Sequence, residues 1–195
     1  FTKPAWIRSN DLTLAQKNLR FSSYQNQKLF SMLNIKYIFS SFKLLSLKLI
    51  YETTATEKNI PVYIYENPQA MPRIYFAKSV KFVNSENAFE ELLKVKDFHN
   101  LTLIERETWN LEPEIQNLKP KNFQVSSFEI QEFQPQLVKI KTQGGGWLIY
   151  SDANLPTWEV TVDNQQTPIY TANYLFKSVF VSEGEHEIIF KYPGL

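Results

Sequence analysis

The sequence predicts an α+β chain in two parts: an N-terminal mixed α/β domain over residues 1–118, and a C-terminal antiparallel β-sandwich-like domain over residues 119–195. Two helical patterns occur in the first part, whereas the second contains only short strand patterns separated by turn residues. Apolar residues make up 43% of the 195-residue chain, so a disordered chain is not expected and a sizeable core can be buried.

Two segments of the first part have helical patterning, residues 22–34 and residues 85–95. Their apolar stripes consist of Leu29, Phe30 and Leu33 in the first segment and of Phe89, Leu92 and Leu93 in the second. Ser22 or Ser23 could cap the first helix, and Ser85 is expected to cap the second, because a serine hydroxyl can accept a hydrogen bond from an otherwise unpaired N–H group of the first turn.

Strand patterns surround these helices, because Tyr, Ile, Val and Phe dominate several short runs, as a pleated surface favours. The expected strands are residues 35–40, 47–53, 62–67, 73–83 and 100–107. The polar segment 54–61 can form a turn, and the segment 68–73 is bracketed by prolines and predicts an irregular crossing. The aperiodic stretch 109–122 contains Pro113 and Pro120 and is where we expect the domain boundary.

The second part reads as about seven short strands, the pattern of a sandwich or barrel. They are expected at residues 123–133, 136–143, 147–152, 158–164, 168–173, 174–182 and 186–192. Turn signals separate several of them: "GGG" at 144–146, "DNQQ" at 163–166 and "SEGE" at 182–185.

The stretch "TWEVTVD" raises the question of whether Trp158 is buried or held outward to grip a ligand. Successive side chains of a strand alternate between faces, so Trp158 shares a face with Val160 and Val162. Burying a large apolar side chain contributes about 1.5–3 kcal/mol, which favours the core or its rim for Trp158. The same alternation places Val138 and Ile140 inside.

The composition excludes several classes of function. The chain has no cysteine, which excludes disulfides and thiolate chemistry. Its 21 basic and 20 acidic residues are scattered, so nucleic acid is not an expected partner. The longest apolar run, residues 44–51, contains Lys48 and is far shorter than the roughly 18 residues that a membrane span needs.

Several sequence blocks occur in an order that resembles the bacterial membrane protein YfhO family. In the second half these are Ser151-Asp152, Pro156-Thr157-Trp158, Pro168-Ile169-Tyr170, Ala172-Asn173 and Gly184-Glu185-His186-Glu187. In the first half they are "LNIKYIFS", "KLIYE" and "VYIYENPQAMPRIYFA". The resemblance runs from about residue 22 to residue 192. The chain departs from the family pattern at Thr157 and Asn164, where glycine is usual, and at Thr171, where a basic residue is common.

The resemblance implies a multi-span membrane protein similar to glycosyltransferases that use lipid-linked sugars and modify cell-envelope polymers. Because the chain begins at Phe1 and shows no span, we expect it to be an extracytoplasmic piece of such a protein, on the outer side of the cell membrane. The acidic catalytic residues of such enzymes lie on loops between early spans, so this piece is expected to be non-catalytic. Its expected partners are its own transmembrane region and an envelope glycan.

Two alternatives of a different class remain open. The β-rich, aromatic-rich second half could be a stand-alone carbohydrate-binding module, or the chain could be a purely structural envelope domain without a ligand. A sugar-binding face stacks aromatic rings on pyranoses and adds a few polar groups. The candidate ligand-binding residues are Tyr150, Tyr170, Asn173 and Tyr174.

Arg73 is a further candidate, because it follows Pro72 in a family-like block and opens an apolar strand. It could contact an anionic polymer, or it could pair with a carboxylate such as Glu66 and fix the chain crossing.

No catalytic residue, metal site or cofactor is predicted. His99 and His186 are the only histidines and have no ligand-spaced partner, and His186 is expected to flank the hairpin turn at Gly184. A Ser-His-Asp site is not expected, because the chain has no G-x-S-x-G elbow. The triple glycine lacks the Lys-Ser/Thr of a phosphate-binding loop, and it precedes a strand rather than a helix.

Overall fold

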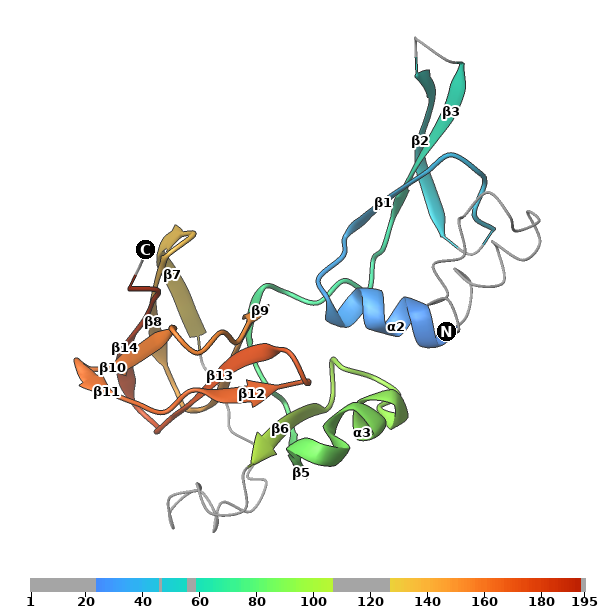
Figure 1. Ribbon diagram of the computed structural model, residues 1–195. Helices are drawn as coiled ribbons and strands as arrows, with labels where there is room; N and C mark the ends of the chain where they lie inside the picture. The colour runs from blue at the N-terminus through green and yellow to red at the C-terminus, as the bar shows by residue number, and fades with distance from the viewer. Residues whose placement is uncertain (1–23, 46, 56–58, 107–126, 194–195) are drawn as a thin grey trace, which may run out of the picture. The chain divides into compact units, whose positions relative to one another are not determined.

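The computed structural model describes residues 24–45, 47–55, 59–106 and 127–193, and the chain divides into two compact units, Phe1–Met71 and Pro72–Leu195 (Figure 1). Both units are rich in β-strands, and nearly all strand pairs are antiparallel. The β-rich character predicted from the sequence is therefore confirmed. The serines expected to cap the first helix, Ser22 and Ser23, lie outside the described residues.

Within its described residues, the first unit contains one helix and a three-stranded sheet in the order β1-β3-β2. Its elements are α2 (Tyr24–Met32), β1 (Tyr37–Ser40), β2 (Lys48–Ala55) and β3 (Ile60–Glu66). Asn67 ties the helix to the sheet, because its Nδ2 donates to Ser31 Oγ at 3.2 Å and to the Ile35 carbonyl at 2.9 Å. The Tyr65 hydroxyl accepts a hydrogen bond from the Leu44 amide at 2.7 Å.

The part of the second unit that the structure describes contains two sheets and the helical segment that follows β5. Its elements are β4 (Ile74–Phe76), β5 (Val80–Asn84), η2 (Ser85–Asn87), α3 (Ala88–Lys94), β6 (Thr102–Arg106), β7 (Ser127–Gln134), β8 (Leu137–Gln143), β9 (Gly146–Ala153), β10 (Glu159–Val162), β11 (Gln165–Gln166), β12 (Tyr170–Ala172), β13 (Phe176–Val181) and β14 (Glu185–Lys191). The six-stranded sheet has the order β4-β9-β13-β12-β6-β5 and the five-stranded sheet the order β11-β10-β14-β8-β7. Strands β5 and β6 are parallel and are joined through α3.

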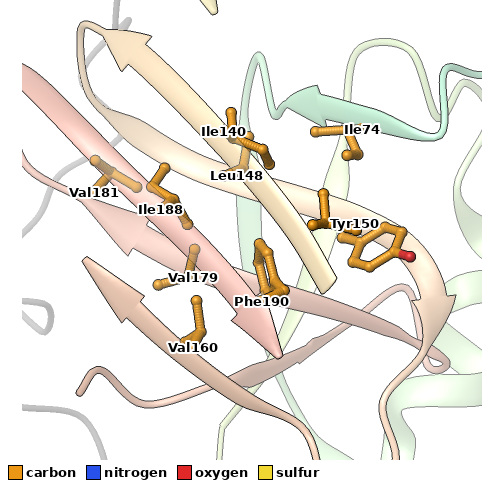
Figure 2. Close-up of a cluster of buried hydrophobic side chains, with 10 residues drawn as sticks. Ile74, Ile140, Leu148, Tyr150, Val160, Val179, Val181, Ile188 and Phe190 are labelled. Atoms are coloured by element: carbon orange, nitrogen blue, oxygen red, sulfur yellow. The ribbon is translucent and has the colours of Figure 1, made fainter. Parts of the chain in front are cut away.

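The main core cluster draws buried side chains from both of these sheets (Figure 2). The five-stranded sheet supplies Val138, Ile140, Val160, Ile188 and Phe190, and the six-stranded sheet supplies Ile74, Leu148, Tyr150, Val179 and Val181. Trp158 and Val162 are partly buried and pack against the cluster. The prediction that Trp158 lies at the core or its rim is therefore confirmed, as are the inward positions of Val138 and Ile140.

The opposite face of β9 has its own aromatic cluster, centred on Trp147, which is 2% exposed. Its ring lies within 5.8 Å of the rings of Phe82, Tyr170 and Phe180, measured between centroids. Because Leu148 and Tyr150 face the other way into the main core, β9 is buried on both faces.

The helix expected over residues 85–95 forms, but its start and its buried face differ from the prediction. Ser85 opens a short 3₁₀ turn, and α3 begins at Ala88 without a side-chain cap. The 3₁₀ turn shifts the helical phase, so Ala88 and Leu92, four residues apart, are the buried residues of α3. Phe89, predicted to be part of the stripe, is 50% exposed and contacts the ring of Tyr174 at 5.4 Å.

The chain divides between residues 71 and 72, and the boundary predicted within residues 109–122 lies outside the described residues. Strands β4, β5 and β6, assigned to the first part from sequence, belong to the same sheet as β9, β12 and β13. Two strand pairings make this join: β4 pairs with β9, with Ile74 opposite Tyr150, and β6 pairs with β12, with Ile104 opposite Ala172. Such long-range pairing leaves no local signal in the sequence.

The turn between β8 and β9 provides a stability test. An added Cβ at Gly145 would lie 2.5 Å from the Ser182 carbonyl oxygen and 2.8 Å from the Glu183 nitrogen, both backbone atoms. We therefore expect Gly145→Ala to lower the free energy of unfolding by about 1–3 kcal/mol, measured by urea denaturation. Gln143→Ala, an exposed control beside the same turn, should change it by less than about 0.5 kcal/mol. Equal midpoints for the two variants would contradict this prediction.

Candidate functional site

A lysine is buried in the face of β13 that otherwise forms the apolar core. Lys177 precedes the core residues Val179 and Val181 at a spacing of two, so its side chain shares their face. The side chain is 0% exposed. A buried ammonium group is costly unless neighbouring groups replace its water, so its surroundings mark a specialised site.

Two aromatic rings and two oxygens surround the Lys177 ammonium. Its Nζ lies 4.0 Å from the ring centroid of Trp158 and 4.7 Å from that of Tyr150. It donates a hydrogen bond to the Ala153 carbonyl at 2.8 Å, and Asp152 Oδ2 lies 3.8 Å away. The negative faces of the rings and the two oxygens thus take the place of water around the cation.

The pKa of Lys177 is lowered from 10.5 to about 8, chiefly because burial disfavours the charged form. The carboxylate of Asp152 opposes this shift, and the positive charge of Arg73 adds to it. Since a pKa of about 8 lies above neutral pH, the side chain is predominantly charged at pH 7.

Asp152 reaches this site because the pairing of β9 with β13 is irregular. Lys177 lies opposite Tyr150, whereas Phe176 lies opposite Ala153, so Ser151 and Asp152 have no partner in the register. A bulge of this kind redirects side chains. The Ser151 amide donates instead to the Arg73 carbonyl at 2.8 Å, which brings Arg73 beside Asp152.

Arg73 lies at the exposed side of the site, just before β4. Its Nη2 is 3.6 Å from Asp152 Oδ2, and its guanidinium carbon is 5.9 Å from the ring centroids of both Phe133 and Tyr150. The Arg73 side chain is 49% exposed and that of Asp152 is 34% exposed. Arg73 therefore pairs with a carboxylate, as one alternative from the sequence proposed, but that carboxylate is Asp152. Glu66 forms an ion pair with Lys48 in the first unit at 3.1 Å.

Aromatic side chains complete the site. The Trp158 ring is 6.0 Å from the ring of Tyr150 and 5.4 Å from that of Tyr192, both in edge-on geometry. Burial and the nearby Asp152 charge raise the pKa of Tyr150, against the effect of its hydrogen bond with Arg73. We use the term aromatic–cationic cluster for Arg73, Phe133, Tyr150, Asp152, Trp158, Lys177 and Tyr192.

The other residues predicted to bind a ligand lie elsewhere in the second unit. Tyr170 is 8% exposed and packs edge-on against Trp147 at 5.2 Å. Tyr174 is 52% exposed, with a positive φ of 69°, and lies against Phe89. Of the five predicted residues, the structure thus brings Arg73 and Tyr150 together and leaves Tyr170, Tyr174 and Asn173 apart from them.

Asn173 supports the fold at the turn between β12 and β13. It is 0% exposed and has a positive φ of 48°, a conformation that asparagine tolerates. Its Oδ1 accepts a hydrogen bond from the Leu103 amide at 2.9 Å, and its Nδ2 lies 3.4 Å from the Tyr75 hydroxyl. Burial raises the pKa of that hydroxyl to about 12.

Sequence reasoning did not single out Lys177, Asp152 or Phe133. The signal for Lys177 was present in "FKSVFV", where alternation puts the lysine on the same face as two inward valines. The position of Asp152 depends on the bulge, and that of Phe133 on the pairing of β7 with β8, neither of which is visible locally.

The family model for bacterial membrane protein YfhO matches residues 94–194. The chain belongs to this family. The match covers the second-half blocks that carried the resemblance, whereas the first-half blocks lie outside the matched range. Neither a curated protein nor a solved structure matched the chain in the corresponding comparisons.

The described residues contain neither a helix able to span a membrane nor a group of side chains able to hold a metal ion. Among those residues, no helix of this YfhO-family chain combines the length and the apolar character that crossing a bilayer requires. Over the same ranges, no three or more His, Asp or Glu side chains are grouped so that they could hold a metal ion.

The depressed pKa of Lys177 predicts a pH-dependent stability. The folded chain releases this proton near pH 8, whereas an unfolded lysine retains it to about 10.5, so stability is lower below pH 8 and rises between the two values. From pH 7.5 to 9.5, urea denaturation should show the free energy of unfolding increasing by about 1–2 kcal/mol.

The matched variants for this test are Lys177→Met and Lys141→Met. The first keeps a long side chain but removes the titrating group, so the increase should disappear. Lys141 is exposed on β8, and its substitution should leave the increase in place. If Lys177→Met kept the full increase, another group would have to be responsible for it.

Proposed function

We propose that this region is an extracytoplasmic accessory domain of a multi-span membrane protein similar to a lipid-linked-sugar glycosyltransferase. In this proposal it holds an anionic cell-envelope polymer, of the teichoic acid kind, in position for glycosylation. Membership of the YfhO family supports the association with a membrane protein. The observation that carries the binding role is the aromatic–cationic cluster, because it combines partly exposed rings with two cationic groups.

The charge of the cluster suits a polyanion. It contains two cations, Arg73 and Lys177, and one anion, Asp152, so its formal charge is +1 at pH 7. Asp152 lies 3.6 Å from Arg73 and 3.8 Å from Lys177, both longer than a close charge-assisted hydrogen bond. An incoming phosphate could therefore engage the Arg73 fork without first breaking a tight pair.

Arg73 would make the direct contact. Its guanidinium presents several N–H donors in a plane that matches a phosphate or a carboxylate. Lys177 is fully buried and would attract the ligand from beneath through its positive charge. This electrostatic attraction is stronger in a low-dielectric site than in water. Trp158 and Tyr192, each partly buried, offer ring surface on which a sugar can stack.

The proposed architecture fits this role. We infer an α+β chain whose second unit is β-sandwich-like, because two sheets contribute to one core cluster. Bond formation by the transferase would belong to the membrane-spanning part, which is also the proposed partner. An accessory domain needs rigidity, and the cluster residues Tyr150 and Lys177 lie on β9 and β13, two adjacent strands of one sheet.

A second candidate is a structural envelope domain without a ligand. The observation that favours it is that Arg73 and Lys177 each lie near Asp152 and near an aromatic ring of the cluster. A stand-alone carbohydrate-binding module is a third reading of the same aromatic surface. Binding measurements separate the three, because only the polyanion proposal requires charge in the ligand.

We expect the purified chain to bind a poly(glycerol phosphate) teichoic acid and not an uncharged dextran, measured by isothermal titration at 50 mM salt. Arg73→Ala should weaken binding at least about tenfold, since a hydrogen bond to a charged group contributes about 1.5–3 kcal/mol. Trp158→Phe, which retains a ring, should weaken it less than Trp158→Ala.

Lys141→Ala is the control for net charge, because it also removes one positive charge and lies on β8 outside the cluster. It should reduce affinity far less than Arg73→Ala does. Equal losses in the two variants would indicate non-specific attraction and contradict the proposal. Binding of dextran as tight as that of the polyanion would favour the carbohydrate-binding module, and binding of neither would favour the structural domain.

A further inference from the structure

Three polar side chains meet where two hairpins approach each other, and one of them is distant in the sequence from the other two. Asp163 lies in the turn between β10 and β11, and Ser182 and His186 flank the turn between β13 and β14. His186 Nδ1 is 2.7 Å from Asp163 Oδ2, and His186 Nε2 is 3.1 Å from Ser182 Oγ. Both separations are hydrogen-bond distances.

One neutral tautomer of His186 satisfies both contacts. Asp163 is an acceptor, so Nδ1 carries the hydrogen and donates to the carboxylate, which leaves Nε2 to accept the Ser182 hydroxyl proton. In this arrangement the serine is the donor, the histidine is the base, and the aspartate orients the histidine. These are the roles that activate a serine nucleophile.

Asp163 is fixed well enough to orient the histidine although its side chain is 51% exposed. Its Oδ1 accepts a hydrogen bond from the Glu187 amide at 2.9 Å, and its own amide donates to the Glu187 carbonyl at 2.9 Å. The hydrogen bonds from His186 and from the Glu187 amide lower the pKa of Asp163, so the carboxylate stays charged at neutral pH.

The three residues line a cavity of about 440 Å³. Its lining also includes Gln165, Thr167, Pro168 and Phe180. The cavity thus places the Ser182–His186 pair beside both apolar surface and amide and hydroxyl groups. A volume of this size falls within the range of small-molecule sites.

We propose that Ser182 is an activated nucleophile that takes the acyl group of a small carboxylic ester bound in this cavity. His186 Nε2 accepts the hydroxyl proton while Ser182 Oγ forms a bond to the ester carbonyl carbon. The tetrahedral intermediate then breaks its bond to the leaving oxygen, which receives the proton from His186 and departs as an alcohol. Water, activated by the same nitrogen, hydrolyses the acyl-serine to a carboxylic acid and restores the hydroxyl group.

The cavity and the exposure of Asp163 restrict the substrate class. Phe180 and Pro168 offer apolar surface for a short acyl chain, whereas Gln165 and Thr167 can hydrogen-bond a hydroxyl-rich alcohol. Because Asp163 is half exposed, it stabilises the imidazolium less than a buried aspartate would. An ester, whose alkoxide leaves more readily than an amide nitrogen, is therefore the substrate that this arrangement suits.

The test uses the full chain with a fluorophosphonate probe at pH 8, analysed by intact mass spectrometry and peptide mapping. The expected result is one adduct, located on Ser182, that is absent from Ser182→Ala. Release of p-nitrophenol from p-nitrophenyl acetate should be at least about tenfold faster than for Ser182→Ala. Ser127→Ala replaces another exposed serine and should leave labelling and release unchanged.

His186→Gln should lose both labelling and release, because glutamine occupies a similar place but cannot take the proton. Urea denaturation of each variant shows whether it is folded, so a loss through unfolding is recognised. The proposal is overturned if the folded chain carries no adduct on Ser182, or if Ser182→Ala releases p-nitrophenol as fast as the parent. These readouts involve no polymer binding, so they do not depend on the function proposed above.

Discussion

The burial of the Lys177 ammonium group at the edge of an apolar core constrains everything around it. An unpaired charge in such a place would cost several kcal/mol, so each neighbour has to offset lost hydration. The Trp158 and Tyr150 rings, the Ala153 carbonyl and the Asp152 carboxylate do this together. Asp152 and Tyr150 also contact Arg73, so the exposed arginine and the buried lysine share two neighbours.

The β9–β13 bulge is the structural means by which this arrangement is reached. Regular pairing would alternate Tyr150, Ser151 and Asp152 strictly between the two faces of the sheet. The register shift instead leaves Ser151 and Asp152 between two paired positions. Asp152 can therefore approach both cations, while Ser151 uses its amide to bind the Arg73 carbonyl. A local irregularity in one strand pair thus assembles a site from three segments of the chain.

Local alternation predicted the inward residues Val138, Ile140 and Val160, because burial acts on each strand separately. The same rule applied to β13 also places Lys177 on the inward face. A lysine is expected to be exposed, however, unless partners for its charge can be identified. The partners of Lys177 lie largely on other segments of the chain, so the sequence of β13 alone does not reveal them. The division near residue 71 and the meeting of Asp163 with His186 likewise depend on long-range pairing. Sequence reasoning therefore identified the family, most of the strands and two residues of the aromatic–cationic cluster. It did not identify the long-range contacts that bring the cluster residues together.

Strands β10 and β13 each run from the aromatic–cationic cluster at one end to the serine cavity at the other, so the length of the strands separates the two sites. Lys177 lies near the start of β13 and Ser182 follows its end, five residues later, which corresponds to about 16 Å along an extended strand. Trp158 precedes β10 and Asp163 follows it, so the second strand repeats the same separation. Sites farther apart than about 10 Å, with no shared partners, usually contribute independently to free energies. The β-framework can thus carry the proposed binding surface at one end and the proposed nucleophilic serine at the other, without either one requiring the other.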